Sequence, residues 1–317
     1  MTALTIFCTP KKFEGHTEII QTNAIKSWLR IKGEIEIILL GPENNPAFNK
    51  IKNIKTHKKI ETDSDGRPLI SSLFEIGQKM AKNEIVCYIN ADIILPKNFL
   101  EIVKKIAHTE DNFLIIGRRI DQDIKTKIKN NKWPEIFNNA NNCKKQLEWY
   151  IDYFCFKKGL FTKMPPFSVG RVGWDNWTIY NAIFKGAKVI DASQDIIAIH
   201  QNHNIGKFNS RAEMERSEGD KKNIFLAGGR DYFFGITDAQ FLLKKGILVK
   251  NKTLIHYFRL FEKSYVLHPK LKILKIIIRP ISFILKQLYE LKSPEITIYK
   301  FKVIYWKIKK IISFSKN

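Results

Sequence analysis

Long hydrophobic runs and paired cysteines are both missing from this 317-residue sequence. No apolar run reaches about 18 residues, and no apolar segment follows a basic N-terminus, so we expect neither a membrane span nor an export signal. The four cysteines lack a CxxC pair, and three of them lie in apolar, strand-like runs. We expect buried free thiols rather than disulfides or zinc ligands, which favours a reducing, cytoplasmic setting.

Acidic residues are scarce: 31 Asp and Glu stand against 54 Lys and Arg, a net charge of +23. The partners of so basic a chain are expected to be anionic, namely nucleic acid, nucleotide phosphates or an acidic membrane surface. RNP, KH, zinc-finger and helix-turn-helix signatures are absent from the sequence. We therefore keep a nucleic-acid-binding protein only as an alternative function and expect no nucleic-acid partner.

Short apolar runs alternate with helical patterns over the first 120 residues, which is typical of βαβ units. Strands are predicted at 4–8, 35–40, 84–89, 113–117, 151–156, 188–190 and 196–200. Helices are predicted across 20–29, 69–81 and 98–107. The polar stretch 121–145 has little periodicity and predicts a mobile surface excursion. The expected fold is α/β, a mostly parallel, Rossmann-like sheet flanked by helices.

The charge divides the chain into two parts, which we expect to be domains at 1–242 and 243–317. Residues 241–317 hold 18 Lys and Arg but only three acidic residues. Their near-helical mixture of lysine and apolar residues predicts a basic amphipathic extension that lies on an anionic membrane surface. The alternative is a helical appendage that packs on the domain and leaves its lysines in solvent.

Candidate metal ligands stand at two predicted strand ends. Asp92 follows the strand at 84–89, and ligands of open α/β sheets bind beyond the carboxyl ends of strands. Mg²⁺ or Mn²⁺ takes oxygen ligands and keeps positions for substrate phosphates; the alternative for Asp92 is a helix cap. His200 ends a later strand and is either a second ligand or a hydrogen-bonded structural histidine.

The segments that carry a family resemblance occur in order along the chain. Two of them are Gly66-Arg67-Pro68-Leu69-Ile70-Ser71-Ser72-Leu73 and residues 81–92, which end in the triplet Asn90-Ala91-Asp92. Over roughly residues 4–242 the sequence resembles GT-A nucleotide-sugar glycosyltransferases, particularly family 2. The segments 5–13, 19–28, 152–154, 173–177 and 200–204 are similar to a bacterial, largely cyanobacterial, branch. The family's DxD motif is Asn-Ala-Asp here, so its first carboxylate is missing and metal dependence is open.

The resemblance implies transfer of a sugar from a nucleotide-diphosphate donor to a saccharide or lipid-linked acceptor in surface-glycan synthesis. Mn²⁺ or Mg²⁺ held by Asp92 and His200 would neutralise the leaving diphosphate. The implied donor-binding residues are Thr9, Pro10, Asp65, Arg67, Asn90 and Asp92. For Asp65 and Arg67 a plain Asp-Gly turn with a solvated arginine is the alternative. The implied setting is cytoplasmic, or peripheral on the inner face of the membrane.

Asp175, in Gly173-Trp174-Asp175-Asn176-Trp177, matches the acidic motif that supplies the base in inverting GT-A enzymes. Its alternative is a helix N-cap beside core tryptophans. Asp152, Trp174, Asn176 and His203 are implied to line the acceptor or sugar pocket, where an indole stacks on a pyranose; His203 is alternatively a diphosphate contact. A GT-A-fold nucleotidyltransferase or a non-catalytic sugar-nucleotide binder is disfavoured, because the loop 9–15 has a single glycine.

Overall fold

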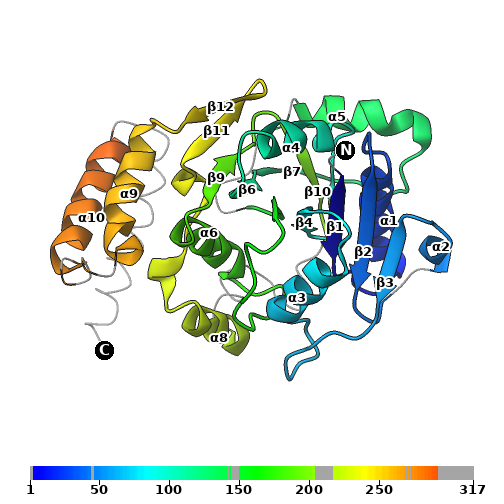
Figure 1. Cartoon of the computed structure of the whole chain (residues 1–317), viewed down its shortest axis with the longest axis horizontal. Helices are drawn as coiled ribbons and strands as arrows, with labels where there is room; N and C mark the ends of the chain where they lie inside the picture. The colour runs from blue at the N-terminus through cyan, green and yellow to red at the C-terminus, as the bar shows by residue number, and fades with distance from the viewer. Residues whose placement is uncertain are drawn as a thin grey trace, which may run out of the picture. The chain divides into compact units, whose positions relative to one another are not determined.

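The computed structural model describes residues 3–43, 46–141, 143, 150–203, 217–268, 270, 273 and 275–291. The chain divides into two compact units, residues 1–251 and 252–317. The first is built on a nine-stranded sheet (Figure 1). Its strand order is β12 (Ile247–Lys250), β11 (Phe241–Lys244), β9 (Lys188–Asp191), β6 (Phe113–Ile116), β8 (Tyr153–Lys157), β4 (Ile85–Ile89), β1 (Leu4–Cys8), β2 (Ile35–Leu40), β3 (Ile54–His57).

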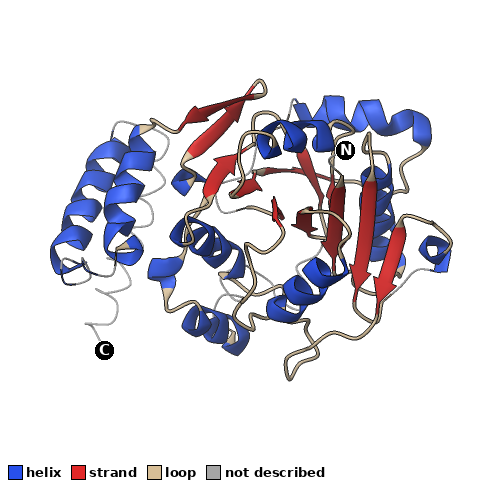
Figure 2. Cartoon of the chain, in the orientation of Figure 1, coloured by secondary structure: helices blue, strands red, loops and turns tan. Residues whose placement is uncertain are grey.

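Most neighbours in this sheet are parallel. β8 runs antiparallel to β4 and β6, and β12 runs antiparallel to β11, whereas the other pairs are parallel. Among its described residues, the α-helices of this unit are α1 (Gly15–Leu29), α2 (Pro46–Asn49), α3 (Ile70–Met80), α4 (Phe99–Ala107), α5 (Trp133–Asn141), α6 (Trp174–Phe184) and α8 (Glu218–Leu226). The predicted α/β fold, a mostly parallel sheet flanked by helices, is confirmed (Figure 2).

Helices cover both faces of the sheet because successive strand side chains point to opposite sides. On β1, Ile6 joins a core with Trp28 of α1 and Val103 of α4. The next residue, Phe7, points the other way and packs edge-on against Phe74 of α3, with ring centroids 5.5 Å apart. Both faces of the central strands are therefore buried, which explains why their sequences are mostly apolar.

The stretch predicted as a mobile surface excursion is instead ordered over most of its length. A second, three-stranded sheet has the strand order β5 (Ile93–Ile94), β10 (Ala198–Gln201), β7 (Arg119–Gln122). Beside it lies a small core of Ile94, Ile120, Ile124, Ile128, Trp133, Ala140 and Ile199. The Asn23 side chain of α1 donates to Thr126 O at 3.0 Å and accepts from Ile128 N at 2.8 Å. The prediction failed because these apolar residues are isolated among polar ones and their burial depends on distant partners.

The first unit continues past the expected boundary at 242/243. That boundary falls inside β11, and β12 completes the sheet at Lys250. The second unit contains α9 (Leu254–Leu267) and α10 (Lys275–Leu291), in agreement with the predicted helical extension. Residues 292–317 of that extension lie outside the described residues. Within the described ranges, no helix combines the length and the apolar character needed to cross a bilayer.

Candidate active site

Asp92 lies in the turn between β4 and β5, just beyond the carboxyl end of β4. Its main-chain carbonyl accepts hydrogen bonds from the backbone N–H of Gln201 at 3.3 Å and from Gln201 Nε2 at 3.0 Å. Gln201 is fully buried at the end of β10. The end of β10, which carries His200, is thereby fixed beside the turn that carries Asp92.

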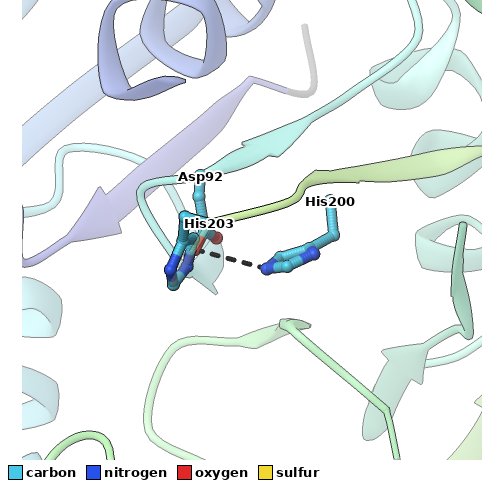
Figure 3. Close-up of side chains that lie close together, drawn as sticks. All are labelled: Asp92, His200 and His203. Atoms are coloured by element: carbon cyan, nitrogen blue, oxygen red, sulfur yellow. Dashed lines mark hydrogen bonds and ion pairs between the residues drawn. The ribbon is translucent and has the colours of Figure 1, made fainter. Parts of the chain in front are cut away.

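Three side chains from these two segments point toward one another (Figure 3). Asp92 Oδ2 lies 3.0 Å from His203 Nε2 and 3.6 Å from His200 Nε2. One potential ligand atom from each residue lies within 4.8 Å of those of the other two. We call these residues the Asp-His-His cluster. The sequence predicted two of them as metal ligands and placed His203 in the acceptor pocket.

The environment of Asp92 keeps its carboxyl group ionised. Burial would raise the pKa of Asp92, but the His203 hydrogen bond and the charges of His200, His203 and Arg119 outweigh it and hold the pKa below its usual value. Among the described residues, no hydrogen-bond partner reaches Asp92 Oδ1, which is buried. A buried carboxylate oxygen without a partner is costly.

The donor set therefore fits a divalent cation. One carboxylate and two imidazoles suit Mn²⁺ and other first-row transition ions, whereas Mg²⁺ prefers oxygen alone. A cation beside Asp92 would also satisfy the Oδ1 atom. The cluster supplies at most three ligands, which leaves coordination positions for substrate oxygens.

A chain of charged side chains continues from the cluster to the neighbouring strands. His200 Nδ1 lies 3.2 Å from Asp121 Oδ1 on β7. Arg119 donates to Asp121 Oδ1 and to Asp152 Oδ2, each at 2.9 Å. Asp152 Oδ1 accepts from Asn90 Nδ2 at 2.7 Å. The sequence reasoning missed Arg119 and Asp121, although an Arg-x-Asp spacing places both side chains on one face of a strand.

The same contacts affect the pKa of Asp121. Burial raises the pKa of Asp121, but His200 and Arg119 more than compensate, so that this pKa is lowered. Asn90 and Asp152, predicted as a donor contact and as a pocket residue, are thus brought together beside Asp92. Both oxygens of the Asp152 carboxylate already have partners.

Thr9 and Pro10 follow β1, the parallel neighbour of β4. Because Phe7 pairs with Tyr88, the two strands end at the same edge of the sheet. Thr9 is half-buried and Pro10 is buried. Thr9 Oγ1 approaches the turn after β2, since a Cβ added at Gly41 would lie 3.3 Å from it. Thr9 and Pro10 therefore lie at the strand end where the sequence predicted the donor contacts.

Asp65 and Arg67 lie in a separate turn, between β3 and α3. The Arg67 guanidinium pairs with Asp65 and lies 3.7 Å from Asp63 Oδ2. Gly66 between them has a φ of +76°, a left-handed conformation that favours glycine. The Asp65 side chain is 61% exposed. The Asp-Gly turn of the alternative is thus present, but its arginine is paired and 34% exposed rather than solvated, and the donor contact stays a prediction.

Asp175 lies in the first turn of α6. Its Oδ1 accepts from the backbone N–H of Asn176 at 2.9 Å, and Asn176 Nδ2 donates to Phe234 O at 2.7 Å. The N-cap is Gly173, with a φ of +95°, so Asp175 is not the cap itself. The Trp174 ring is 6% exposed and packs against Tyr88, 5.3 Å between centroids. Trp174 therefore occupies the core position that the sequence gave as its alternative.

Comparisons with known proteins give no family and no curated relative. No family model matches the sequence, and no curated protein matches it. The crystal structure of S. aureus TarS 1–349 is similar at 12% identity, a TM-score of 0.44, and coverage of 63% of this chain and 60% of that chain. The crystal structure of the same TarS segment in complex with UDP-GlcNAc is similar at 12% identity and a TM-score of 0.49. That match covers 71% of this chain and 65% of the TarS chain. The match spans less than two thirds of those TarS chains.

Proposed function

We propose that this chain is a metal-dependent glycosyltransferase of the GT-A type, which takes a sugar from a nucleotide-diphosphate donor. The observation that carries the proposal is the Asp-His-His cluster at the carboxyl edge of the parallel sheet, with its buried Asp92 Oδ1, to which no described residue offers a hydrogen bond. Ligands of open α/β sheets bind at this edge. The sequence resemblance supports the reaction type.

In this proposal the cluster holds Mn²⁺ or Mg²⁺ through Asp92, His200 and His203. The bound cation would neutralise the charge that develops on the diphosphate as the anomeric bond breaks. Thr9 and Pro10, beyond the adjacent strand end, are placed to contact the nucleoside. The acceptor is a saccharide or a lipid-linked saccharide of surface-glycan synthesis.

Asp175 is the proposed base that takes the proton from the acceptor hydroxyl, which implies inversion at the anomeric carbon. Its place in the first turn of α6 supports a charged carboxylate, because a helix N-terminus favours negative charge. Asp175→Asn should leave donor binding unchanged. Release of nucleoside diphosphate from the donor should fall by about 10²- to 10⁴-fold, the usual contribution of a general base. Equal turnover by this variant would remove Asp175 from the mechanism.

The donor site is tested by thermal shift with UDP, GDP, dTDP and CMP, each with and without Mn²⁺. A ligand at about 100 times its Kd adds about 2.7 kcal/mol to the stability of the native state. We expect one diphosphate to raise the melting temperature only with metal, and Asp92→Asn to abolish that shift. The matched control is Asp111→Asn, which changes a fully exposed carboxylate just before β6. If no nucleotide shifts the wild type, the proposed donor class is wrong.

We also propose that the second unit attaches the enzyme to the inner, anionic face of a membrane. Apolar side chains are exposed on both of its helices, including Tyr257 at 53%, Ile276 at 82% and Phe283 at 64%. Residues 252–317 contain 15 Lys and Arg against three acidic residues. Exposed apolar side chains combined with an excess of cations suit an acidic lipid interface.

Vesicle sedimentation tests this attachment. The full chain should bind phosphatidylserine-containing vesicles but not pure phosphatidylcholine vesicles, and added salt should weaken the binding. Ile276→Asp should reduce it. Ile247→Asp changes an equally apolar side chain, 65% exposed on β12 of the first unit, and should not. Equal binding to both vesicle types would contradict the electrostatic attachment.

A further inference from the structure

We propose that Asp121 is a positioning residue, which orients His200 so that its Nε2 atom faces Asp92 and is available to a cation. The inference rests on the proposed function for the identity of that cation. The orientation of the ring does not depend on it and can be tested separately.

The backbone places these two residues side by side. β10 and β7 are parallel, and His200 pairs with Asp121 in their register. The two side chains meet on one face of the small sheet as an ion pair, with His200 Nδ1 3.2 Å from Asp121 Oδ1; among the described residues this nitrogen has no partner with hydrogen-bond geometry. On the other side of the imidazole, Nε2 lies 3.6 Å from Asp92 Oδ2. The ring therefore stands between two carboxylates, one from the turn after β4 and one from β7.

Arg119 fixes Asp121 in turn. It pairs with the same Asp121 oxygen through Nε and with Asp152 through a terminal nitrogen, and its guanidinium lies 4.7 Å from the Tyr150 ring centroid. The side chain of Arg119 is only 15% exposed. A planar guanidinium held at several points loses little further freedom, so it is a rigid support for the carboxylate.

From Asp152 the contacts lead back to the turn that carries Asp92. Asp152 accepts from the Asn90 side chain at 2.7 Å, and the Asp152 carbonyl accepts from the Asn90 backbone at 3.0 Å. Asn90 is two residues before Asp92. A closed path of contacts thus runs from residues at the ends of β4 and β8 to side chains of β7 and β10, and holds the His200–Asp92 pair in place.

The chemistry explains why this arrangement would matter. A neutral imidazole has one N–H and one lone pair, and a carboxylate beside Nδ1 favours the form in which Nδ1 carries the proton. The lone pair then lies on Nε2, toward Asp92. In metal sites, carboxylates that hold a histidine in this way typically change metal affinity by about 10- to 100-fold when they are removed.

Mn²⁺ affinity of the full chain, measured by electron paramagnetic resonance, tests the proposal. Asp121→Ala should bind Mn²⁺ about 10- to 100-fold more weakly than the wild type. Asp121→Asn should lie between the two, since it keeps an oxygen beside Nδ1 but removes the negative charge. The control is Asp123→Ala, which removes an exposed carboxylate two residues away that contacts Asn202. Wild-type affinity in Asp121→Ala would overturn the proposal.

Nitrogen-15 NMR of the His200 ring in metal-free protein separates positioning from general stability. At a pH where the ring is neutral, the wild type should show the form protonated on Nδ1, and Asp121→Ala a mixture or the other form. A wild-type ring protonated on Nε2 would overturn the proposal. If the wild type binds no Mn²⁺, the metal-dependent function fails, and the NMR result alone decides whether Asp121 positions His200. Asp121→Asn supplies the comparison if Asp121→Ala does not fold.

Discussion

Glu36 on β2 is a nearly buried carboxylate that three groups hold in its charged form. Thr5 Oγ1 donates to it at 2.7 Å and Lys82 N at 2.9 Å, and Lys55 Nζ pairs with it at 2.7 Å. Burial raises the pKa of Glu36, but these contacts outweigh burial and hold the pKa below its usual value. A lowered pKa means that the ionised form contributes to stability.

Glu36→Gln should lower the free energy of unfolding at neutral pH by about 1.5 to 3 kcal/mol, the range for hydrogen bonds to a charged group. The contribution is complete above the unfolded pKa, about 4.3, and is lost as pH falls through the lower, folded pKa. Urea unfolding of both proteins at decreasing pH checks this. The difference should shrink below about pH 4; a constant difference would mean that charge plays no part.

The four cysteines should differ sharply in reactivity. Cys8, Cys87 and Cys155 are buried, whereas Cys143 is exposed. Burial also raises the pKa of the Cys8 and Cys155 thiols, so the reactive thiolate is disfavoured there. A disulfide reagent should modify one thiol rapidly in the native protein and four after denaturation. Rapid modification of two or more thiols would contradict the burial of the strand cysteines.

Single residues of the site were predictable where they end a strand. Asp92 and His200 were predicted as site residues in this way, because ligands of open α/β sheets bind at the carboxyl ends of strands, and a strand end can be located from the sequence alone. Asp121 was not found. Its role depends on the pairing of β7 with β10, two short strands almost 80 residues apart whose register no local pattern determines.

At the scale of elements, Gly77 shows how closely α3 packs on the sheet. A Cβ added at Gly77 would lie 2.4 Å from Cδ2 of the Phe7 ring on β1. In a free helix, alanine is favoured over glycine by about 1 kcal/mol. Here the buried Phe7 ring has Phe74 and Tyr88 against it, with centroids 5.5 Å away in each case. The ring cannot yield without disturbing its neighbours.

Gly77→Ala should therefore destabilise the protein, by about 1 to 3 kcal/mol, because overpacking outweighs helix propensity. Chemical denaturation measures the change. Glu75→Ala, at an exposed position of the same helix, is the matched control and should stay within about 0.5 kcal/mol of the wild type. A gain in stability for Gly77→Ala would show that α3 is free to move away from β1.

The elements themselves were predicted best where burial is continuous. The strands at 4–8 and 35–40 have the predicted bounds, since both of their faces are covered and each sequence is apolar except for one residue, Thr5 or Glu36. The β11–β12 hairpin was missed. Its Leu243 is buried, but Lys244, Lys245 and Lys250 around it are polar, so the strand pattern is interrupted.

At the scale of the whole molecule, the residues of the proposed site all belong to the first unit. Two regions of different charge were predictable from the sequence, but only the change in composition placed the boundary between them. The structure adds a hairpin that pairs with β9 through Phe241 and Leu242. The charge therefore begins to rise inside the sheet, before the second unit starts at Lys252.

Two fragments test this division. Fragment 1–251 retains every strand of the sheet and should unfold cooperatively. Fragment 1–242 loses β12, the buried side chain of Leu243 and the bond from Asn251 Nδ2 to Ala239 O at 2.9 Å. It also loses two backbone donors, Lys245 and Gly246, that bond to Asp195. Its free energy of unfolding should be lower by about 2 kcal/mol or more, the usual cost of losing one buried leucine side chain.

Urea unfolding of the two fragments, monitored by circular dichroism, gives this difference directly. A lower midpoint for fragment 1–242 would show that residues 243–251 complete the sheet. Equal midpoints would show that the hairpin adds nothing to the first unit and would favour the boundary at 242/243. Because the Asp-His-His cluster lies wholly within both fragments, Mn²⁺ binding by fragment 1–251 should match that of the full chain, whichever boundary is correct.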